Sequence, residues 1–79
     1  MNWRDHIGIH PDVLAGKPVI KGTRIAVQLL LDRLADGWTE DEIVTAYAGV
    51  TPDALHAVFA FTSEVMRDED YVARGIAAA

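Results

Sequence analysis

The sequence predicts one mainly α-helical domain, in which three helices follow short N-terminal β-strands or a hairpin. The chain has 79 residues, 51% of them apolar, which is enough core material for a single small domain. The spacing of its apolar residues alternates near Ile7 and changes to a helical period after Ala26. Helix-capping residues then recur at Thr39 and Thr51 and divide the second half of the chain into short helices.

The N-terminal part is expected to consist of extended pieces joined by turns. An arm of residues 1–6 should be loosely ordered, with Trp3 as a candidate anchor. Pro18 places the second extended piece at a sheet edge or a strand start, because proline cannot donate a ladder hydrogen bond. Lys21-Gly22 is a turn signal. The extended pieces are residues 7–10, 18–20 and 23–25.

Amphipathic helices of about 11, 9 and 15 residues are predicted after Ala26. Gly37 should close the first helix in the left-handed conformation. The second helix begins with the capping box Thr39-Glu40-Asp41-Glu42 and ends at Gly49, and Thr51 caps the third. The last two helices have the layout of a helix-turn-helix. The predicted apolar stripe of the first helix is Val27, Leu30, Leu31 and Leu34. That of the third helix is Leu55, Val58, Phe59, Thr62, Val65 and Met66, widened by Ala54, Ala57, Ala60 and Phe61.

Composition and charge narrow the classes of function. The net charge of −5 and the pI of about 4.9 argue against an obvious nucleic-acid binder. Without cysteine, the chain has no disulfide and no thiolate zinc site. No signal peptide is apparent, and no apolar run reaches the roughly 18 residues needed to span a bilayer, so a cytoplasmic protein with no membrane association is expected. The apolar excess favours an oligomer, here a homodimer, or a bound partner.

The chemically densest stretch is Gly16–Ile25, with the sequence G-K-P-V-I-K-G-T-R-I. It contains Lys17, Lys21 and Arg24, whereas residues 34–66 contain no lysine or arginine. One interpretation is that these cations are solvated side chains around turns, with Arg24 paired to an aspartate at the first helix. The other is that they form a contact surface for phosphate or carboxylate groups, to which the planar fork of Arg24 is best suited.

Residues along much of the chain resemble the family of proteins of unknown function DUF433. The resemblance rests on Pro11-Asp12, Gly16–Ile25 and Val27, and it extends over about residues 7–66 through Asp36-Gly37, Thr39–Glu42, Tyr47 and Thr51–Asp53. These small bacterial proteins are grouped with VapB-like antitoxins of type II toxin–antitoxin systems. The resemblance implies a homeodomain-like helix-turn-helix domain over residues 7–66, after the arm 1–6 and before a tail of residues 67–79. It also implies a non-catalytic antitoxin that dimerises, binds a toxin with a PIN-like nuclease fold and represses its own operon.

A helix-turn-helix presents the start of its recognition helix to DNA bases and uses cations to contact phosphates. The candidate DNA-binding residues are Lys17, Lys21, Arg24, Thr51 and His56. Asp53 argues against DNA binding, because its charge is repelled by the phosphate backbone, and so does the absence of lysine and arginine from the third helix before Arg67. The alternative is a protein–protein interaction and dimerisation module that binds no DNA.

The tail supplies the candidate toxin-binding residues, which are Tyr71, Val72, Arg74 and Ile76. The PIN-like nucleases that the resemblance implies have an acidic, metal-binding active site, which an arginine flanked by apolar side chains is suited to occupy. The alternative is a frayed terminus. For the homodimer, Val19, Ile20 and Ile25 are candidates for an exposed strand edge that pairs across a twofold axis.

No catalytic, cofactor or metal site is expected. Ser63 is the only serine, and the carboxylates have the positions of helix caps and surface charge. His6 and His10 are four residues apart, but Gly8 and Pro11 argue against the helix that would direct them to one metal ion. We therefore expect a protein that is not an enzyme and that carries no cofactor.

Overall fold

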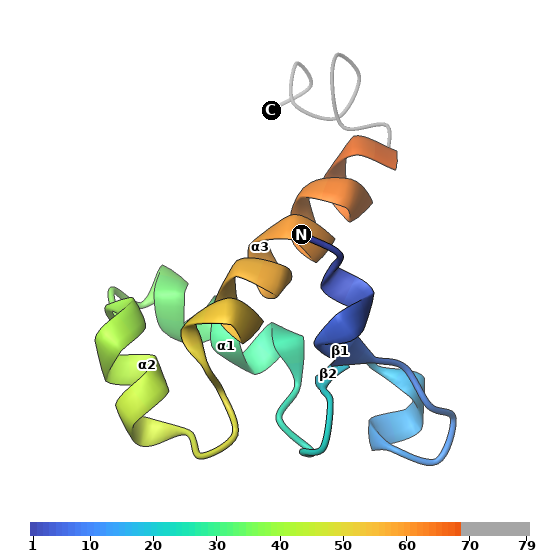
Figure 1. The fold of residues 1–79 in the computed structure, drawn as a ribbon, viewed down its shortest axis with the longest axis horizontal. Helices are drawn as coiled ribbons and strands as arrows, with labels where there is room; N and C mark the ends of the chain where they lie inside the picture. Colours follow the sequence, from blue (N-terminus) through green and yellow to red (C-terminus); the bar gives the residue numbers. More distant parts are fainter. Residues whose placement is uncertain (69–79) are drawn as a thin grey trace.

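The computed structural model describes residues 1–68 and gives a mostly helical domain with a two-stranded antiparallel hairpin before the helices (Figure 1). This arrangement confirms the predicted fold class of three helices that follow short strands. The elements are the 3-10 helix η1 (Trp3–Asp5), strand β1 (Ile7–Gly8), the 3-10 helix η2 (Leu14–Gly16), strand β2 (Val19–Ile20), and helices α1 (Val27–Ala35), α2 (Glu40–Ala46) and α3 (Pro52–Asp68). None of the helices within residues 1–68 is long and apolar enough to cross a membrane.

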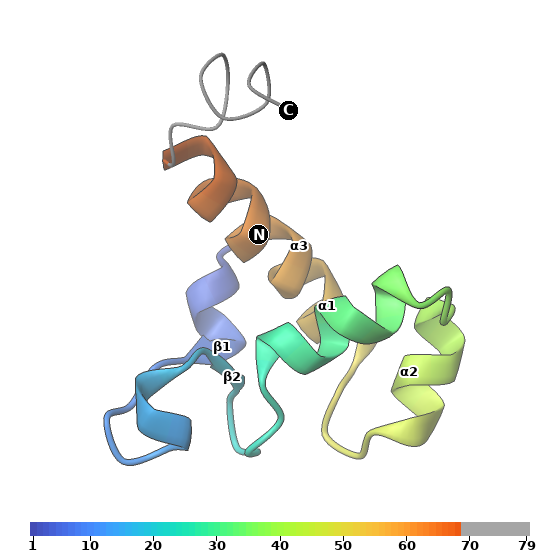
Figure 2. The same cartoon turned by 180° about the vertical axis from the view of Figure 1, so that it is seen from behind.

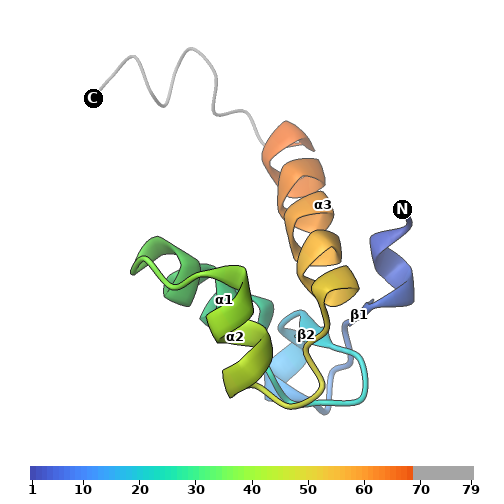
Figure 3. The ribbon, with the colours of Figure 1, turned by 60° about the vertical axis from the view of Figure 1, so that its left-hand side comes forward.

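The elements lie on two sides of α3, the longest helix in the described part of the chain. η1 and the hairpin lie on one side of α3, and α1 and α2 lie on the other (Figure 2). Figure 3 shows α3 rising away from the body of the domain. At the opposite end of the molecule, the loops of residues 21–26 and 47–51 meet.

The hairpin is shorter than the alternating pattern predicts. Ile7 pairs with Ile20, and Gly8 pairs with Val19. The strand predicted over residues 7–10 ends at Gly8, because the next two residues turn outward and are exposed. The piece predicted to be extended over residues 23–25 forms no strand, although the N–H of Ile20 donates to the Ile25 carbonyl at 3.0 Å and the next residue, Ala26, bridges to Val19.

The predicted helix caps are confirmed. Gly37 follows α1 with a φ of +98°, in the left-handed region. At the start of α3, the Thr51 hydroxyl accepts a hydrogen bond from the N–H of Ala54 at 3.1 Å. At α2, the Thr39 hydroxyl accepts from the N–H of Glu42 at 3.1 Å, and the Glu42 carboxylate accepts from the N–H of Thr39 at 2.9 Å. The backbone N–H of Thr39, and then its hydroxyl, lower the pKa of Glu42.

The hydrophobic core joins the hairpin to the helices. Its buried side chains are Ile7, Val19, Ile20, Val27, Leu30, Ile43, Val50, Ala54, Leu55, Ala57 and Val58. Val19 and Ile20 are each only 2% exposed. The prediction that they form an exposed dimer edge with Ile25 is therefore wrong, because the hairpin uses these side chains to hold itself against the helices.

α3 buries only one side of the wide apolar stripe predicted for it. Ala54, Leu55, Ala57 and Val58 are buried and Phe61 packs against them, as predicted. On the other side of the stripe, Phe59 and Val65 are each 42% exposed and Met66 is 54% exposed, so their predicted burial is wrong. Small alanine side chains allow the helix to approach its neighbours closely, so the core selects the alanine face and leaves larger side chains outside.

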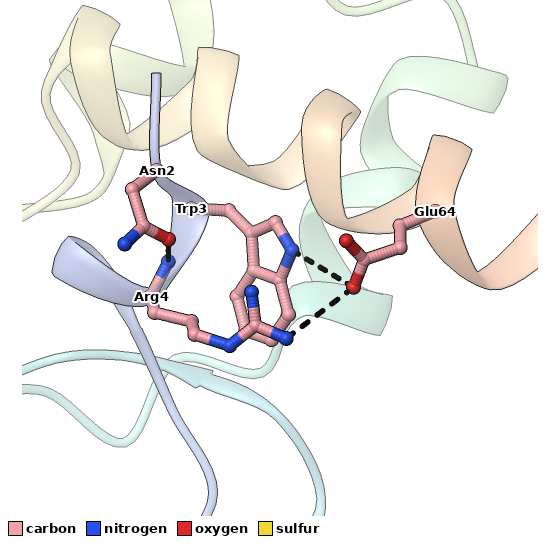
Figure 4. Close-up of polar contacts among 4 residues, drawn as sticks. All are labelled: Asn2, Trp3, Arg4 and Glu64. Carbon is pink, nitrogen blue, oxygen red and sulfur yellow. Dashed lines mark hydrogen bonds and ion pairs between the residues drawn. The ribbon is translucent and has the colours of Figure 1, made fainter.

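The N-terminal arm is ordered and contains η1, so the prediction that it is loosely ordered is wrong. The prediction that Trp3 anchors the arm is confirmed (Figure 4). The Asn2 side chain caps η1 by accepting a hydrogen bond from the N–H of Arg4 at 3.1 Å. The Trp3 ring meets Phe61 edge to face at 4.8 Å between centroids, and its Nε1 donates to the Glu64 carboxylate at 3.2 Å. The Arg4 guanidinium lies 4.3 Å from the centroid of the Trp3 ring and 3.6 Å from the same carboxylate. The arm is thereby fastened to the second half of α3.

Candidate functional site

A tight turn after β2 carries Lys21 and leads to Arg24. The N–H of Thr23 donates to the Ile20 carbonyl at 3.0 Å and closes this turn. Gly22 has a φ of +79°, which suits glycine at the third position of a type II turn. The Thr23 hydroxyl donates to the Ile20 carbonyl at 2.8 Å and accepts from the N–H of the residue after Arg24 at 2.9 Å. The backbone that bears both cations is therefore fixed by local hydrogen bonds.

The loop between β1 and β2 has a backbone conformation that is rare for residues with a side chain. Leu14 and Ala15 have φ values of +48° and +57°, and Gly16 follows at +82°. Each non-glycine residue in this region costs about 1–2 kcal/mol. The N–H of Gly16 donates to Val13 at 3.0 Å, and the N–H of Lys17 donates to Leu14 at 3.2 Å, which holds the strained turn in place. Strain of this kind is concentrated at functional sites, and it makes the loop a candidate.

A hollow between this loop and the tight turn brings three basic side chains together. Its lining includes His10, Val13, Lys21, Gly22, Thr23 and Arg24, and it contains no carboxylate. Gly8 lies under two of these side chains, because a Cβ built on it would be 3.0 Å from His10 Nε2 and 3.5 Å from Lys21 Cγ. We call this group of side chains, His10, Lys21 and Arg24, the basic hollow. Its donors and charge suit an anion.

The positive charges of the basic hollow are not neutralised by ion pairs with other described residues. Within residues 1–68, Lys21 and Arg24 take part in no ion pair. Asp36 lies 3.9 Å from Arg33 instead, and Asp32 accepts a hydrogen bond from a glutamine one turn before it at 2.9 Å. The alternative in which Arg24 pairs with Asp32 or Asp36 is therefore wrong.

Lys17 lies apart from the basic hollow, at an apolar groove between α1 and α3. The groove is lined by Lys17, Pro18, Val27, Leu31, Phe61 and Val65, with two polar side chains. The cations of the segment Gly16–Ile25 are thus divided between two sites. Phe59 and Met66 are further exposed apolar side chains on α3. We call the groove together with these two side chains the apolar surface.

The remaining candidate DNA-binding residues lie at the start of α3. Thr51 is exposed and its hydroxyl is already used as the helix cap, while His56 is exposed one turn later. Asp53 is exposed between them, and the first turn of α2 adds three exposed carboxylates. Gly49 connects this region to the tight turn, since a Cβ built on it would lie 2.8 Å from the Thr23 methyl group. The tight turn that borders the basic hollow therefore lies against the loop that leads into α3.

The structure provides no placement for the tail candidates Tyr71, Val72, Arg74 and Ile76, which lie outside the described residues. Within residues 1–68, no group of three or more histidine, aspartate or glutamate side chains is arranged to hold a metal ion.

Sequence reasoning missed two features of these sites. His10 was considered only as a metal ligand beside His6, yet it faces the cations of a segment more than ten residues away in the chain. The signal was Gly8, an unusual residue inside a strand, which marks a place where other groups approach the backbone closely. The apolar surface was missed because Phe59, Val65 and Met66 have helical spacing and were assigned to the core.

Comparisons with known proteins identify the family of the chain but no individual curated protein or solved structure that is similar to it. The family model described as a protein of unknown function, DUF433, matches residues 7–62. No curated protein and no solved structure matches the chain.

Proposed function

The chain belongs to the DUF433 family of proteins of unknown function, and from this membership together with its resemblance to VapB-like antitoxins we propose that it is an antitoxin-like component of a type II toxin–antitoxin system. In this role it binds and neutralises a toxin with a PIN-like nuclease fold. It acts by contact and has no catalytic activity or cofactor of its own. The proposed place of action is the cytoplasm.

The observation that carries this proposal is the apolar surface. Phe59 and Val65 are 42% exposed and Met66 is 54% exposed on one helix of a very small domain, and Val65 lines a groove that is mostly apolar. Several large apolar side chains exposed on one helix beside an apolar groove are typical of a protein-binding site. Lys17 at this groove gives it a positive charge that suits a partner with carboxylates, as the acidic nuclease site of a PIN-like toxin has.

The apolar surface also leads directly to the candidate toxin-binding residues of the tail. Met66 precedes Tyr71 by five residues and Arg74 by eight. Because Arg74 follows the apolar surface so closely in the sequence, we propose one partner for both. In the proposal, the groove supplies most of the buried apolar area, and Arg74 occupies the nuclease site.

A second activity, repression of the operon through a homeodomain-like helix-turn-helix, is supported by the arrangement of α2 and α3. The two helices are joined by residues 47–51, and Thr51 and His56 are exposed at the start of α3. The tight turn that borders the basic hollow lies against the loop that leads into α3, and from there the hollow would meet phosphates on either side of the groove that α3 enters. The acidic first turn of α2 and Asp53 favour the alternative of a protein-binding module without DNA.

The toxin proposal is tested by producing the full chain together with the protein encoded beside it and measuring growth and co-purification. Wild-type chain should restore growth, and a Phe59→Glu/Val65→Glu variant should bind at least about tenfold more weakly, because it places charges on exposed side chains of the apolar surface and leaves the core intact. A chain that ends after Met66 should also lose neutralisation while keeping its fold. Full neutralisation by both variants contradicts the proposal.

Two further measurements address the DNA contact and the homodimer. A gel-shift titration against the upstream promoter at several salt concentrations separates repression from the protein-binding alternative, since phosphate contacts give a steep salt dependence. The mass of the protein in solution tests the proposed homodimer. With Val19 and Ile20 buried, the dimer must use a surface other than the strand edge.

A further inference from the structure

We propose that the basic hollow binds a phosphate group, with His10, Lys21 and Arg24 as its side-chain ligands. The ligand is either a phosphate of a nucleic-acid backbone or a free phosphate compound, and both present the same tetrahedral oxyanion. The first source rests on the DNA contact proposed above, whereas the second is independent of it.

The charge of the hollow matches a phosphate. Lys21 and Arg24 provide two permanent positive charges, and they have no ion-pair partner within residues 1–68. The lining contains no carboxylate that would repel an anion. Arginine presents a planar fork of donors that fits two oxygens of a phosphate, and lysine adds a point charge. A single carboxylate would leave part of this charge uncompensated.

The geometry brings the three ligands to one place. The hollow has a volume of about 420 Å³, which is ample for a phosphate group. The absence of a side chain at Gly8 lets the His10 ring and the Lys21 side chain converge over the hairpin. Gly22 similarly leaves open space at the tip of the turn, because a Cβ built on it would meet nothing within 4 Å.

The backbone around the hollow is fixed before any ligand arrives. The N–H of Lys21 donates to His6 at 2.9 Å, and the His10 carbonyl accepts from Val13 at 3.0 Å. The hydrogen bonds of residues 1–68 leave the N–H groups of Gly22 and Arg24 without a protein acceptor, so both can donate to an anion. A preorganised set of donors reduces the entropy that binding must overcome.

The test is a titration of the ¹⁵N-labelled full chain with inorganic phosphate at constant ionic strength, followed by the amide shifts of Gly22 and Arg24. Saturable shifts are expected, and Arg24→Gln and Lys21→Gln should each weaken binding about tenfold. Lys17→Gln is the matched control. It removes the same charge at the apolar groove, and it should change the affinity less than about twofold.

Two results would overturn the inference. One is an equal loss of affinity in Lys17→Gln, which would show a diffuse charge effect and no site. The other is an equal set of shifts with acetate, which would show that the hollow does not select phosphate. Because the substituted side chains are exposed, thermal unfolding of each variant should match the wild type.

A second arm replaces phosphate with a short DNA duplex and identifies the source of the ligand. Competition between duplex and phosphate for the same amide shifts assigns the hollow to the nucleic-acid backbone. Saturation by phosphate without duplex binding assigns it to a free phosphate compound and removes the proposed DNA contact. Duplex binding that Arg24→Gln and Lys21→Gln leave unchanged retains the DNA contact and excludes the nucleic-acid backbone as the ligand of the hollow.

Discussion

Replacing Gly49 by alanine should destabilise the fold through two separable effects. The φ of Gly49 is +91°, and an alanine in the left-handed region costs about 1–2 kcal/mol. A Cβ at this position would also lie 2.8 Å from the Thr23 methyl group, whereas carbon atoms pack at about 3.5–4.0 Å. To relieve that overlap, Thr23 must shift the hydroxyl that holds the tight turn, at an added cost of about 1–2 kcal/mol. The total expected loss is about 2–4 kcal/mol of unfolding free energy.

Two comparison variants separate these effects. Gly37 has a similar φ of +98°, but a Cβ there would meet nothing within 4 Å, so Gly37→Ala should cost only about 1–2 kcal/mol. Thr23→Ser removes the methyl group and keeps the hydroxyl, and it should cost about 0.8 kcal/mol or less alone. In the Thr23→Ser background, the loss of unfolding free energy caused by Gly49→Ala should fall to that caused by Gly37→Ala.

The assay is urea unfolding of the four proteins of the cycle, with Gly37→Ala as the reference for the φ effect. A coupling free energy of about 1–2 kcal/mol between residues 23 and 49 is expected, since contacting residues are not additive. The reasoning is refuted if Gly49→Ala costs no more than Gly37→Ala, or if its effect adds to that of Thr23→Ser without coupling.

Three further predictions concern other parts of the fold. Ala15→Gly should raise the free energy of unfolding, measured in urea, by about 0.5–1 kcal/mol. Glycine relieves the strain of a φ of +57°, and this gain exceeds the added entropy of the unfolded chain. A lower free energy of unfolding would contradict the claim that Ala15 is strained. The lowered pKa of Glu42 means that its cap stabilises the fold above its unfolded pKa and loses that effect as pH falls through the folded value. The difference in melting temperature between wild type and Glu42→Ala should therefore shrink below about pH 4.3, and a constant difference would disprove the linkage. Trp3→Ala should lower the free energy of unfolding by about 3 kcal/mol, and Trp3→Phe by less than half of that. The reason is that phenylalanine keeps the edge-to-face contact with Phe61. Equal losses in the two variants would show that the hydrogen bond from the indole to Glu64 dominates.

The helix starts, and the end of the first helix, could be predicted because their signals are local, whereas the second helix ends at Ala46 and not at the predicted Gly49. A capping box, a threonine before proline and a glycine after a helix act through hydrogen bonds within a few residues, so Thr39, Thr51 and Gly37 could be assigned from the sequence alone. The turn at Lys21-Gly22 could be predicted for the same reason. The turn needs a positive φ at its third residue, and Gly22 can adopt one whatever surrounds it.

The faces and long-range contacts could not be predicted in the same way. The stripe predicted for α3 was too wide, because the buried alanine side and the exposed side of Phe59, Val65 and Met66 both have helical spacing. The choice between them depends on how closely other elements approach, which no local pattern encodes. His10 likewise joins the basic hollow only through the pairing of β1 with β2, and Trp3 finds its partners 58 and 61 residues away. The division of Lys17 from Lys21 is a consequence of the strand between them.

The contact of Trp3 with Glu64 shows where the folded domain begins and ends in the sequence. The family match covers residues 7–62, and both residues of this contact lie outside it. A fragment cut to the matched boundaries would keep Phe61 and lose the indole ring that covers it. The structural unit is therefore longer at both ends than the segment by which its relatives are recognised. Chains chosen for expression should begin at Met1 and extend past Glu64, because a match to a family model marks shared sequence and not the limits of packing.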